Sequence, residues 1–319
     1  MFPTLQHPSR YIWDFWYYFN PTDRLFHIFY LNADPALVPL GQHPYSACIG
    51  HATTLDFTQI AWGSPSVLAA AAEHWANTSL WTGDMVKIHD GFLLFFTSRN
   101  RHQDDGMTQH IGAAYAPSLQ GPWQLTPLCI QPGHCYQRKS APGDLTIHAW
   151  RDPFLFRDQG QTYMLVSAKV AADTLGKNGA IALLRLQGND PLNDPWEYLD
   201  PLARPGCYAE MEVPQIYRNN QGHYELVFST WAKYDFATST QAVGGLQGFT
   251  QAQLGDVDCH PQVLLPEAAG LYACRIIPEL GGEIVGFDSA TGGLRRSGVK
   301  TGFQHCDRDF SSLVMNWDG

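Results

Sequence analysis

The chain has 319 residues, among them 29 Gly, 21 Pro, 17 Phe, 14 Tyr and 10 Trp, whereas charged residues make up only 16%. This composition favours short strands joined by many turns over long helices, which would need more Ala, Glu and Lys. The net charge of −10 at pH 7 argues against nucleic acid or an anionic membrane as partner, because both require basic surfaces.

Signals for export, metal binding and membrane insertion are missing from the sequence. The stretch from Met1 to Pro8 has neither a basic nor an apolar segment, so we expect no export and a cytoplasmic location. The seven cysteines, Cys259 included, contain no CxxC pair, which predicts mostly buried thiols rather than a zinc site or a complete disulfide framework. No apolar run is long enough to span a membrane. We therefore expect no cofactor, metal or membrane partner, and the sequence leaves the oligomeric state open.

One pattern recurs five times, a turn followed by a short strand rich in apolar and aromatic residues. In the first three copies a further strand follows, which opens with an isoleucine and leads to a tryptophan. Each unit has room for about four strands, the content of a propeller blade. The sequence therefore predicts an all-β, five-bladed β-propeller that forms a single domain over residues 1–319. The copies begin at Arg24, Gly91, Gly160, Gly222 and Gly282, at spacings of 67, 69, 62 and 60 residues.

Two segments lie outside this pattern. Pro65 to His74 contains four consecutive alanines and is the best helix candidate, as an insert between two blades. The residues from Phe303 to Val314 could supply a closing strand.

A carboxylate precedes the turn and strand in each of the first four units, where the innermost strand of a blade would line the central channel. Clustered carboxylates oppose one another's ionisation, so one of them should hold its proton near neutral pH while the others stay charged. Such a set can break a glycosidic bond, because an acid protonates the leaving oxygen and a carboxylate meets the cationic carbon. The four acids are Asp14, Asp84, Asp152 and Glu212, and the fifth unit offers Arg275 instead.

The residues around these acids suit a small carbohydrate. Trp13, Trp16 and Trp81 could form a platform on which a sugar ring stacks, although packing in the channel wall would explain them equally well. Asp84 is expected to bind substrate beside them. His51, in a Gly-His-Ala-Thr stretch, is expected to make structural hydrogen bonds more readily than to contact substrate.

Four short motifs resemble those of the levansucrase family and of the related invertase family, glycoside hydrolase families 68 and 32. They are Trp-Asp-x-Trp at 13–16, Trp-x-Gly at 81–83, Arg-Asp-Pro at 151–153 and Glu-x-Glu-x-Pro at 210–214, and they occur in the family order. The resemblance implies a five-bladed propeller with a funnel-shaped pocket and an enzyme that processes fructosyl groups.

By this resemblance Asp14 matches the nucleophile, Glu212 the general acid/base, and Asp152 the stabiliser of the transition state, with Arg151 beside it. Glu210 matches a substrate-binding acid and competes with Glu212 for the acid role, since proton transfer depends on geometry. The chain departs from the family pattern at two places. Val213 replaces the Arg or Cys expected after the acid/base, and Asp84 stands where a small hydroxyl residue is usual.

The sequence thus predicts a retaining glycoside hydrolase, with or without transfer to an acceptor sugar, that acts on a β-fructofuranoside such as sucrose or a short fructan. One alternative is an inverting enzyme of the arabinan or xylan type on the same propeller. Another is a propeller that binds a sugar without catalysis. Neither the sugar nor the linkage follows from the sequence.

Overall fold

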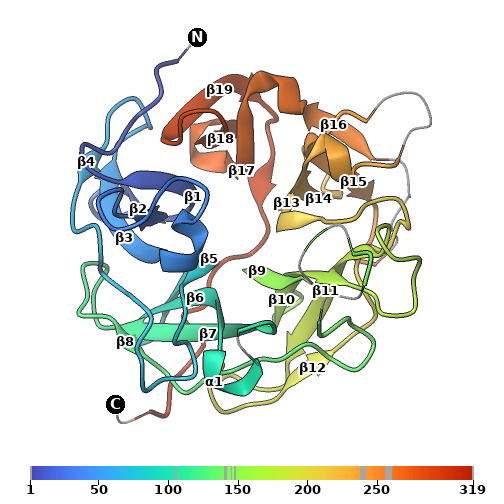
Figure 1. The fold of residues 1–319 in the computed structure, drawn as a ribbon, viewed down its shortest axis with the longest axis horizontal. Helices are drawn as coiled ribbons and strands as arrows, with labels where there is room; N and C mark the ends of the chain where they lie inside the picture. Colours follow the sequence, from blue (N-terminus) through green and yellow to red (C-terminus); the bar gives the residue numbers. More distant parts are fainter. Residues whose placement is uncertain are drawn as a thin grey trace.

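The computed structural model of this protein describes residues 2–104, 106–139, 142–144, 146, 149–237, 242–255 and 261–317. These residues form five antiparallel sheets side by side around a common axis, which confirms the five-bladed β-propeller (Figure 1). Sheets 1 and 2 contain β1 (Tyr11–Asn20), β2 (Leu25–Ala33), β3 (Cys48–Thr54) and β4 (Ala61–Trp62), then β5 (Trp81–Ile88), β6 (Gly91–Arg99), β7 (Gln109–Ala116) and β8 (Gln124–Leu125).

Sheets 3 to 5 continue the series in chain order. Sheet 3 contains β9 (Trp150–Asp158), β10 (Gln161–Lys169), β11 (Gly179–Leu186) and β12 (Trp196–Tyr198). Sheet 4 contains β13 (Glu212–Arg218), β14 (Tyr224–Thr230), β15 (Gly245–Gln251), β16 (Gln262–Leu265) and, from far along the chain, β20 (Gln304–His305). Sheet 5 contains β17 (Leu271–Ile277), β18 (Glu283–Asp288) and β19 (Leu294–Lys300).

The first strand of every sheet lies at the centre of the propeller. These inner strands contact one another in a closed ring, β1 against β5, β5 against β9, β9 against β13, β13 against β17, and β17 against β1. The second strands, β2, β6, β10, β14 and β18, begin at or just after the five turn signals of the repeat. At the turn into β10, Gly160 has a φ of +79°, a left-handed conformation that glycine adopts without steric cost.

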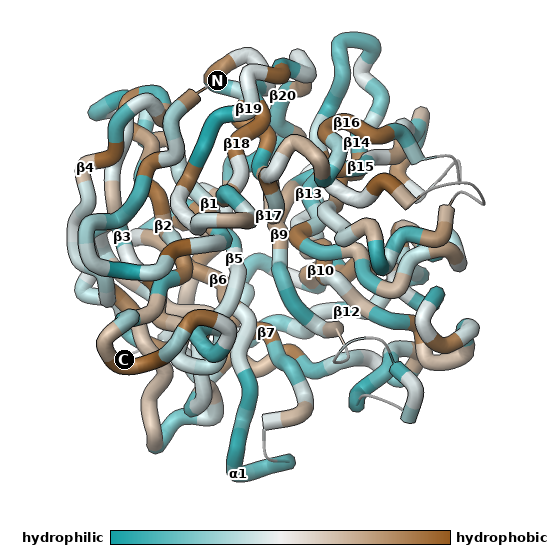
Figure 2. Tube along the Cα trace, turned by 45° about the horizontal axis from the view of Figure 1, so that its top comes forward, coloured by the Kyte–Doolittle hydropathy of each residue, from teal (hydrophilic) through white to brown (hydrophobic). Residues whose placement is uncertain are grey.

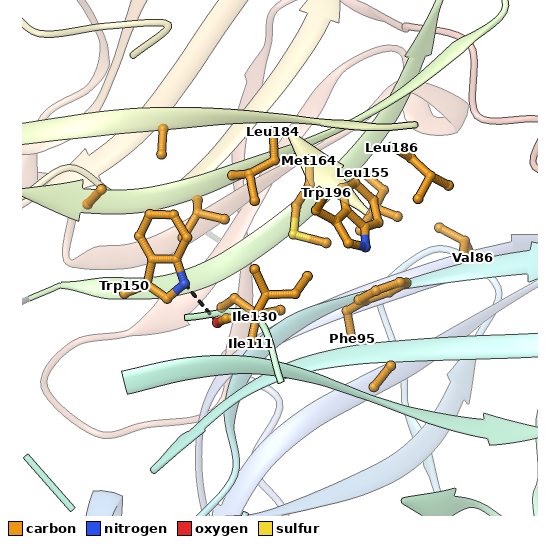
Figure 3. Close-up of a cluster of buried hydrophobic side chains, with 14 of the residues drawn as sticks. Val86, Phe95, Ile111, Ile130, Trp150, Leu155, Met164, Leu184, Leu186 and Trp196 are labelled. Carbon is orange, nitrogen blue, oxygen red and sulfur yellow. Dashed lines mark hydrogen bonds between the residues drawn. The ribbon is translucent and has the colours of Figure 1, made fainter. Parts of the chain in front are cut away.

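Apolar side chains fill the space between neighbouring sheets. The largest buried cluster joins sheets 2 and 3, where Phe95 and Ile111 meet Leu155, Met164 and Leu184 (Figure 3). Trp150, fully buried beside them, donates its indole N–H to the carbonyl oxygen of Ile130 at 3.0 Å. A large apolar ring can be buried here because its one polar group has a partner.

Helical structure is short in the described part of the chain. The α-helix α1 covers only Arg101–Asp104, in a hydrophilic, exposed segment (Figure 2). The single-turn 3₁₀ helices are η1 (His43–Ser46), η2 (Ala232–Tyr234), η3 (Glu267–Ala269) and η4 (Pro278–Leu280). Among the described residues, none of these segments has the length and apolar character that a transmembrane helix needs.

The helix predicted for Pro65–His74 is wrong. The segment is extended at Leu68, whose backbone N–H and C=O both bond to Ile49 on β3, at 3.3 and 2.9 Å. Pairing with a sheet edge satisfies these polar groups and buries Leu68, which outweighs the weak helix preference of the alanines that follow.

The cysteine prediction holds in part. Cys274 and Cys306 are buried, whereas the other described cysteines, Cys48, Cys129, Cys135 and Cys207, are only half-buried. Cys259 lies outside the described residues.

Both ends of the chain pair with the sheets, and the strand expected within residues 303–314 does form, as β20. Leu5 pairs with Leu294 on β19 through two backbone hydrogen bonds of 2.7 and 3.1 Å, so the N-terminal segment borders sheet 5. The C-terminal β20 pairs instead with β13 of sheet 4. In the view of Figure 1 the chain then crosses the centre of the ring, as the red trace, and it buries Phe310 and Leu313 in the cluster between sheets 2 and 3.

Candidate active site

The first residues of the five inner strands surround a cavity of about 420 Å³, within the size range of small-molecule sites. All three predicted catalytic acids line it. One side chain from each inner strand takes part: Asp14 from β1, Thr82 from β5, Asp152 from β9, Glu212 from β13 and Tyr272 from β17.

Later residues of the same five strands line a second cavity, of about 280 Å³. Every inner strand therefore runs in the same direction along the propeller axis, with its start at the first cavity and its later part at the second. The residues that line the second cavity include Tyr18, Asp84, Phe154, Tyr217 and Arg275.

Each inner strand is interrupted by a bulge at the level of the first cavity. In β9, Asp152 and Pro153 together face one residue of β10, and the other inner strands show the same irregularity against their second strands. Asp152, Val213 and Ala273 have φ values of 59°, 52° and 45° at these bulges. A bulge turns side chains out of the regular alternation, and so it lets neighbouring residues of one strand face the cavity.

Asp14 is held by a donor from the neighbouring sheet. The Thr82 hydroxyl on β5 donates a hydrogen bond to its carboxylate. Burial and then the charge of Asp152 raise the pKa of Asp14 to about 7, against the opposing effects of the Thr82 hydrogen bond, Arg275 and Arg151. Near neutral pH this carboxyl group is therefore balanced between its charged and neutral forms.

Asp152 is held through both its backbone and its side chain. Its backbone N–H donates to the Thr97 hydroxyl at 2.9 Å, and its carboxylate accepts the N–H of Val213 at 2.9 Å. The Arg151 guanidinium lies 3.7 Å from the same carboxylate. Burial raises the pKa of Asp152, while Arg151 lowers it. The side chain is only 4% exposed, so it is a rigid acceptor in the cavity wall.

Arg151 joins Glu212, the first residue of β13, and Glu210, two residues before it, to this group. Its Nη2 donates to Glu210 at 2.7 Å and also to Glu212. The Tyr272 hydroxyl donates to the other oxygen of Glu212. Burial raises the pKa of Glu210 to about 7, although Arg151 acts in the opposite direction. Four carboxyl groups and one guanidinium thus meet in a single cavity.

Aromatic rings form part of the cavity wall. Trp13 and Trp81 line the cavity, and Trp81 is oriented by its indole N–H, which donates to the carbonyl oxygen of Pro44 at 2.6 Å. On the opposite side Trp231 stacks on Tyr272 with ring centroids 3.8 Å apart. Such faces can cover the apolar side of a sugar ring while the carboxylates bind its hydroxyl groups.

Three residues named from the sequence do not reach this cavity. Trp16 is buried between sheets 1 and 2 and borders the second cavity. Asp84 also faces the second cavity, where Arg308 binds both of its oxygens at 2.9 and 3.0 Å. His51 lies within sheet 1, with its ring nitrogen 3.0 Å from that of His27, so its contacts are structural.

The error at Asp84 has a simple cause. Thr82 and Asp84 are two residues apart on β5, a distance of about 6.6 Å along a strand. This distance is enough to place Thr82 at the first cavity and Asp84 at the second. In the structure Thr82, rather than Asp84, places a small hydroxyl group beside Asp14. Thr82 is the middle residue of the Trp-x-Gly motif at 81–83, so the motif covered this position without specifying its residue.

Several residues of the cavity wall carry no acidic signal in the sequence, among them Tyr272 and Trp231. Tyr272 stands on β17 directly before the bulge, the position that Glu212 occupies on β13, and Trp231 follows the second strand of sheet 4. A comparison of all residue types at equivalent repeat positions would have found Tyr272. Among the described residues, no three His, Cys, Asp or Glu side chains are arranged to hold a metal ion.

Comparison with known families agrees with the fold and the motifs. The family model described as the glycosyl hydrolases family 32 N-terminal domain matches residues 17–238, well over half of the chain. The chain belongs to glycosyl hydrolase family 32. It is therefore a glycoside hydrolase, and Arg151, Asp152, Glu210 and Glu212 lie inside the part that matches family 32, whereas Asp14 lies just before it.

Solved structures share the fold at low sequence identity. An inulosucrase from Halalkalicoccus jeotgali bound to kestose has 20% identity and a TM-score of 0.65, over 90% of this chain and 80% of that chain. A Bacillus subtilis levansucrase variant in complex with oligosaccharides has 14% identity and a TM-score of 0.71, over 97% and 90%. A Microbacterium saccharophilum beta-fructofuranosidase variant has 19% identity and a TM-score of 0.66, over 92% and 71%. No curated protein matches this family 32 sequence significantly.

Proposed function

We propose that this family 32 protein is a retaining glycoside hydrolase that cleaves a β-fructofuranoside such as sucrose or a short fructan. The observation that carries the proposal is the meeting of Asp14, Asp152 and Glu212, from three different sheets, in one cavity of about 420 Å³. The names of the enzymes with the same fold support fructosides as substrates, since they are an inulosucrase, a levansucrase and a beta-fructofuranosidase.

In the first step Asp14 attacks the anomeric carbon while Glu212 gives its proton to the leaving oxygen. A fructosyl ester of Asp14 forms and the aglycone departs as an alcohol. In the second step Glu212 takes a proton from water or from an acceptor sugar, whose oxygen attacks the anomeric carbon and releases Asp14. Asp152, held rigidly in the cavity wall, accepts hydrogen bonds from the fructosyl hydroxyls and stabilises the positive charge of the transition state.

Glu212 is preferred to Glu210 as the proton donor because of exposure. The Glu212 side chain is 17% exposed to the cavity, whereas that of Glu210 is 4% exposed. A proton donor must come within hydrogen-bond distance of the leaving oxygen, so the more accessible carboxyl group suits the role. Glu210 then keeps Arg151 in place between the two glutamates.

The test compares Asp14→Asn, Glu212→Gln and Glu210→Gln on sucrose and on an activated aryl β-fructoside. Asp14→Asn should lower kcat on both substrates by a factor on the order of 10³ or more. Glu212→Gln should lose most activity on sucrose but keep more on the aryl fructoside, whose leaving group needs little protonation. If Glu210→Gln shows that selective pattern instead, the acid role belongs to Glu210.

Stereochemistry is tested with methanol as acceptor. NMR of the methyl fructoside that forms first should show the β anomer, as retention requires, whereas the α anomer would indicate inversion. Turnover of arabinosides or xylosides without turnover of fructosides would overturn the substrate assignment. Binding of all these sugars without any turnover would contradict the catalytic roles. The cytoplasmic location expected from the sequence stays a prediction.

A further inference from the structure

We propose that Arg275, on the inner strand of sheet 5, is a positioning residue that holds the Asp14 carboxylate and the bulges of β1 and β5 in place from beneath the cavity. This inference rests on the proposed role of Asp14 as nucleophile. Arg275 does not line the first cavity, and it borders the second one. It must therefore act through Asp14 and not on the substrate.

The guanidinium of Arg275 binds the two backbone segments that carry Asp14 and its hydrogen-bond donor. Its Nε donates to the carbonyl oxygen of Phe15, the residue after Asp14, at 3.1 Å. Its Nη2 donates to the carbonyl oxygen of Gly83, the residue after Thr82, also at 3.1 Å. One rigid side chain thus sets the distance between β1 and β5 at the level where the Thr82 hydroxyl reaches Asp14.

The backbone at Gly83 leaves little freedom on its other side. A Cβ atom at this position would lie 1.8 Å from the carbonyl oxygen of Phe95 on β6. Strand β5 is therefore held between the backbone of β6 and the guanidinium of Arg275. A lysine at position 275 would keep the positive charge but could not present two fixed donors in the same plane.

The charge of Arg275 lies between carboxylates on both sides. It interacts with Asp84 toward the second cavity and with Asp152 and Asp14 toward the first, while the Tyr217 hydroxyl also faces it. Asp84 is already paired with Arg308. Arg275 is 3% exposed and, as a guanidinium, keeps its proton. Its charge therefore remains available to Asp14 and Asp152.

This charge matters because the two largest influences on Asp14 favour its neutral form. Burial and Asp152 both disfavour ionisation of Asp14, whereas Arg275, Arg151 and the Thr82 hydrogen bond favour it. A nucleophile must be ionised, and so the loss of one cation should move the pH range of activity upward.

The experiment measures kcat/KM for sucrose against pH in the whole protein, the Arg275→Met variant and the Arg275→Lys variant. In Arg275→Met the acidic limb of the profile should move to higher pH by about one unit. In Arg275→Lys the limb should move less, while kcat at its optimum should fall at least about tenfold because the two carbonyl contacts are lost. KM should change little in both variants. If Arg275→Met does not fold, the Lys variant alone decides, since an unchanged kcat there would overturn the proposal.

The matched control is Arg308→Met, which removes another buried arginine, at the second cavity. It should lower the thermal stability and leave the acidic limb in place. An equal shift in this control, or no shift in Arg275→Met, would overturn the positioning role. A failure of the proposed function can be told apart from a failure of this proposal. If Asp14 is not the nucleophile, the Asp14→Asn variant retains turnover, and that result does not depend on the Arg275 variants.

Discussion

At the scale of single residues, this site concentrates acids that would be unfavourable anywhere else in the protein. Asp14, Asp152, Glu210 and Glu212 share one cavity, and burial raises the pKa values of the first three. Because the neighbouring charges interact, their protons come off as a coupled set. An arrangement of this kind costs folding free energy, which is the usual consequence of shaping a site for chemistry.

The first prediction follows from the raised pKa of Asp14. A carboxyl group whose folded pKa of about 7 exceeds its unfolded value of 3.8 holds its proton more tightly in the folded protein. Its contribution to stability is therefore full below pH 4 and is lost as the pH rises through 7. At pH 8 the Asp14→Asn variant should be more stable than the natural protein, by about 1 to 2 kcal/mol after allowance for solvent screening in this half-buried site.

The measurement is urea unfolding at pH 5 and pH 8. The gain in the free energy of unfolding should be larger at pH 8, and the exposed Asp90→Asn should show no gain at either pH. A gain that is larger at pH 5 would contradict the electrostatic explanation.

At the scale of elements, the inner strands are built around their bulges. Pro153 and Pro214 directly follow Asp152 and Val213, and proline within a strand is confined to edges and bulges, so the sequence carried this signal. Asp152, Val213 and Ala273 all adopt positive φ values at these points, which is rare for residues with a Cβ atom and strained for valine. Strain of this kind gathers at functional sites.

The second prediction tests that strain at Ala273, which has a φ of 45° and is buried. Glycine there would relieve a left-handed conformation that costs an alanine about 1 to 2 kcal/mol. This gain should offset the lost methyl group and the greater freedom of the unfolded chain, so Ala273→Gly should change the free energy of unfolding by less than about 0.5 kcal/mol. The matched change Ala114→Gly, in the regular part of β7, should cost about 1 to 2 kcal/mol. Equal costs in chemical denaturation would show that Ala273 is not strained.

At the scale of the whole molecule, both chain ends hold the ring together. The N-terminal segment borders sheet 5 through Leu5, and the C-terminal segment pairs with β13 and then packs between sheets 2 and 3. Arg308 on this second segment binds Asp84 of β5 and the carbonyl oxygen of Leu155 on β9. The C-terminal segment therefore contacts sheets 2, 3 and 4 and connects them on the side of the second cavity.

The third prediction concerns the packing of the C-terminal segment between sheets 2 and 3. Phe310 is 1% exposed in the cluster between sheets 2 and 3. Phe310→Ala should lower the free energy of unfolding by about 3 to 5 kcal/mol, because it removes a buried ring and leaves a cavity. The exposed Leu37→Ala should leave stability within about 0.5 kcal/mol. Thermal unfolding checks both variants, and a small loss for Phe310→Ala would mean that the C-terminal segment packs independently of the ring.

Much of this arrangement was determined by the sequence alone. The five turn-and-strand signals mark the second strand of each sheet, because strand periodicity and turn chemistry are local properties of the chain. The positions of Asp14, Asp152 and Glu212 at the starts of inner strands follow from the same repeat.

Tertiary structure alone decided which residues face the first cavity and which face the second. Thr82 and Asp84 lie on the same strand, yet one meets Asp14 and the other meets Arg308. Likewise Leu68 pairs with β3 although alanines follow it. The physical reason is that local preferences fix the type of an element, whereas height along the propeller axis depends on bulges and on contacts between sheets that lie far apart in the chain.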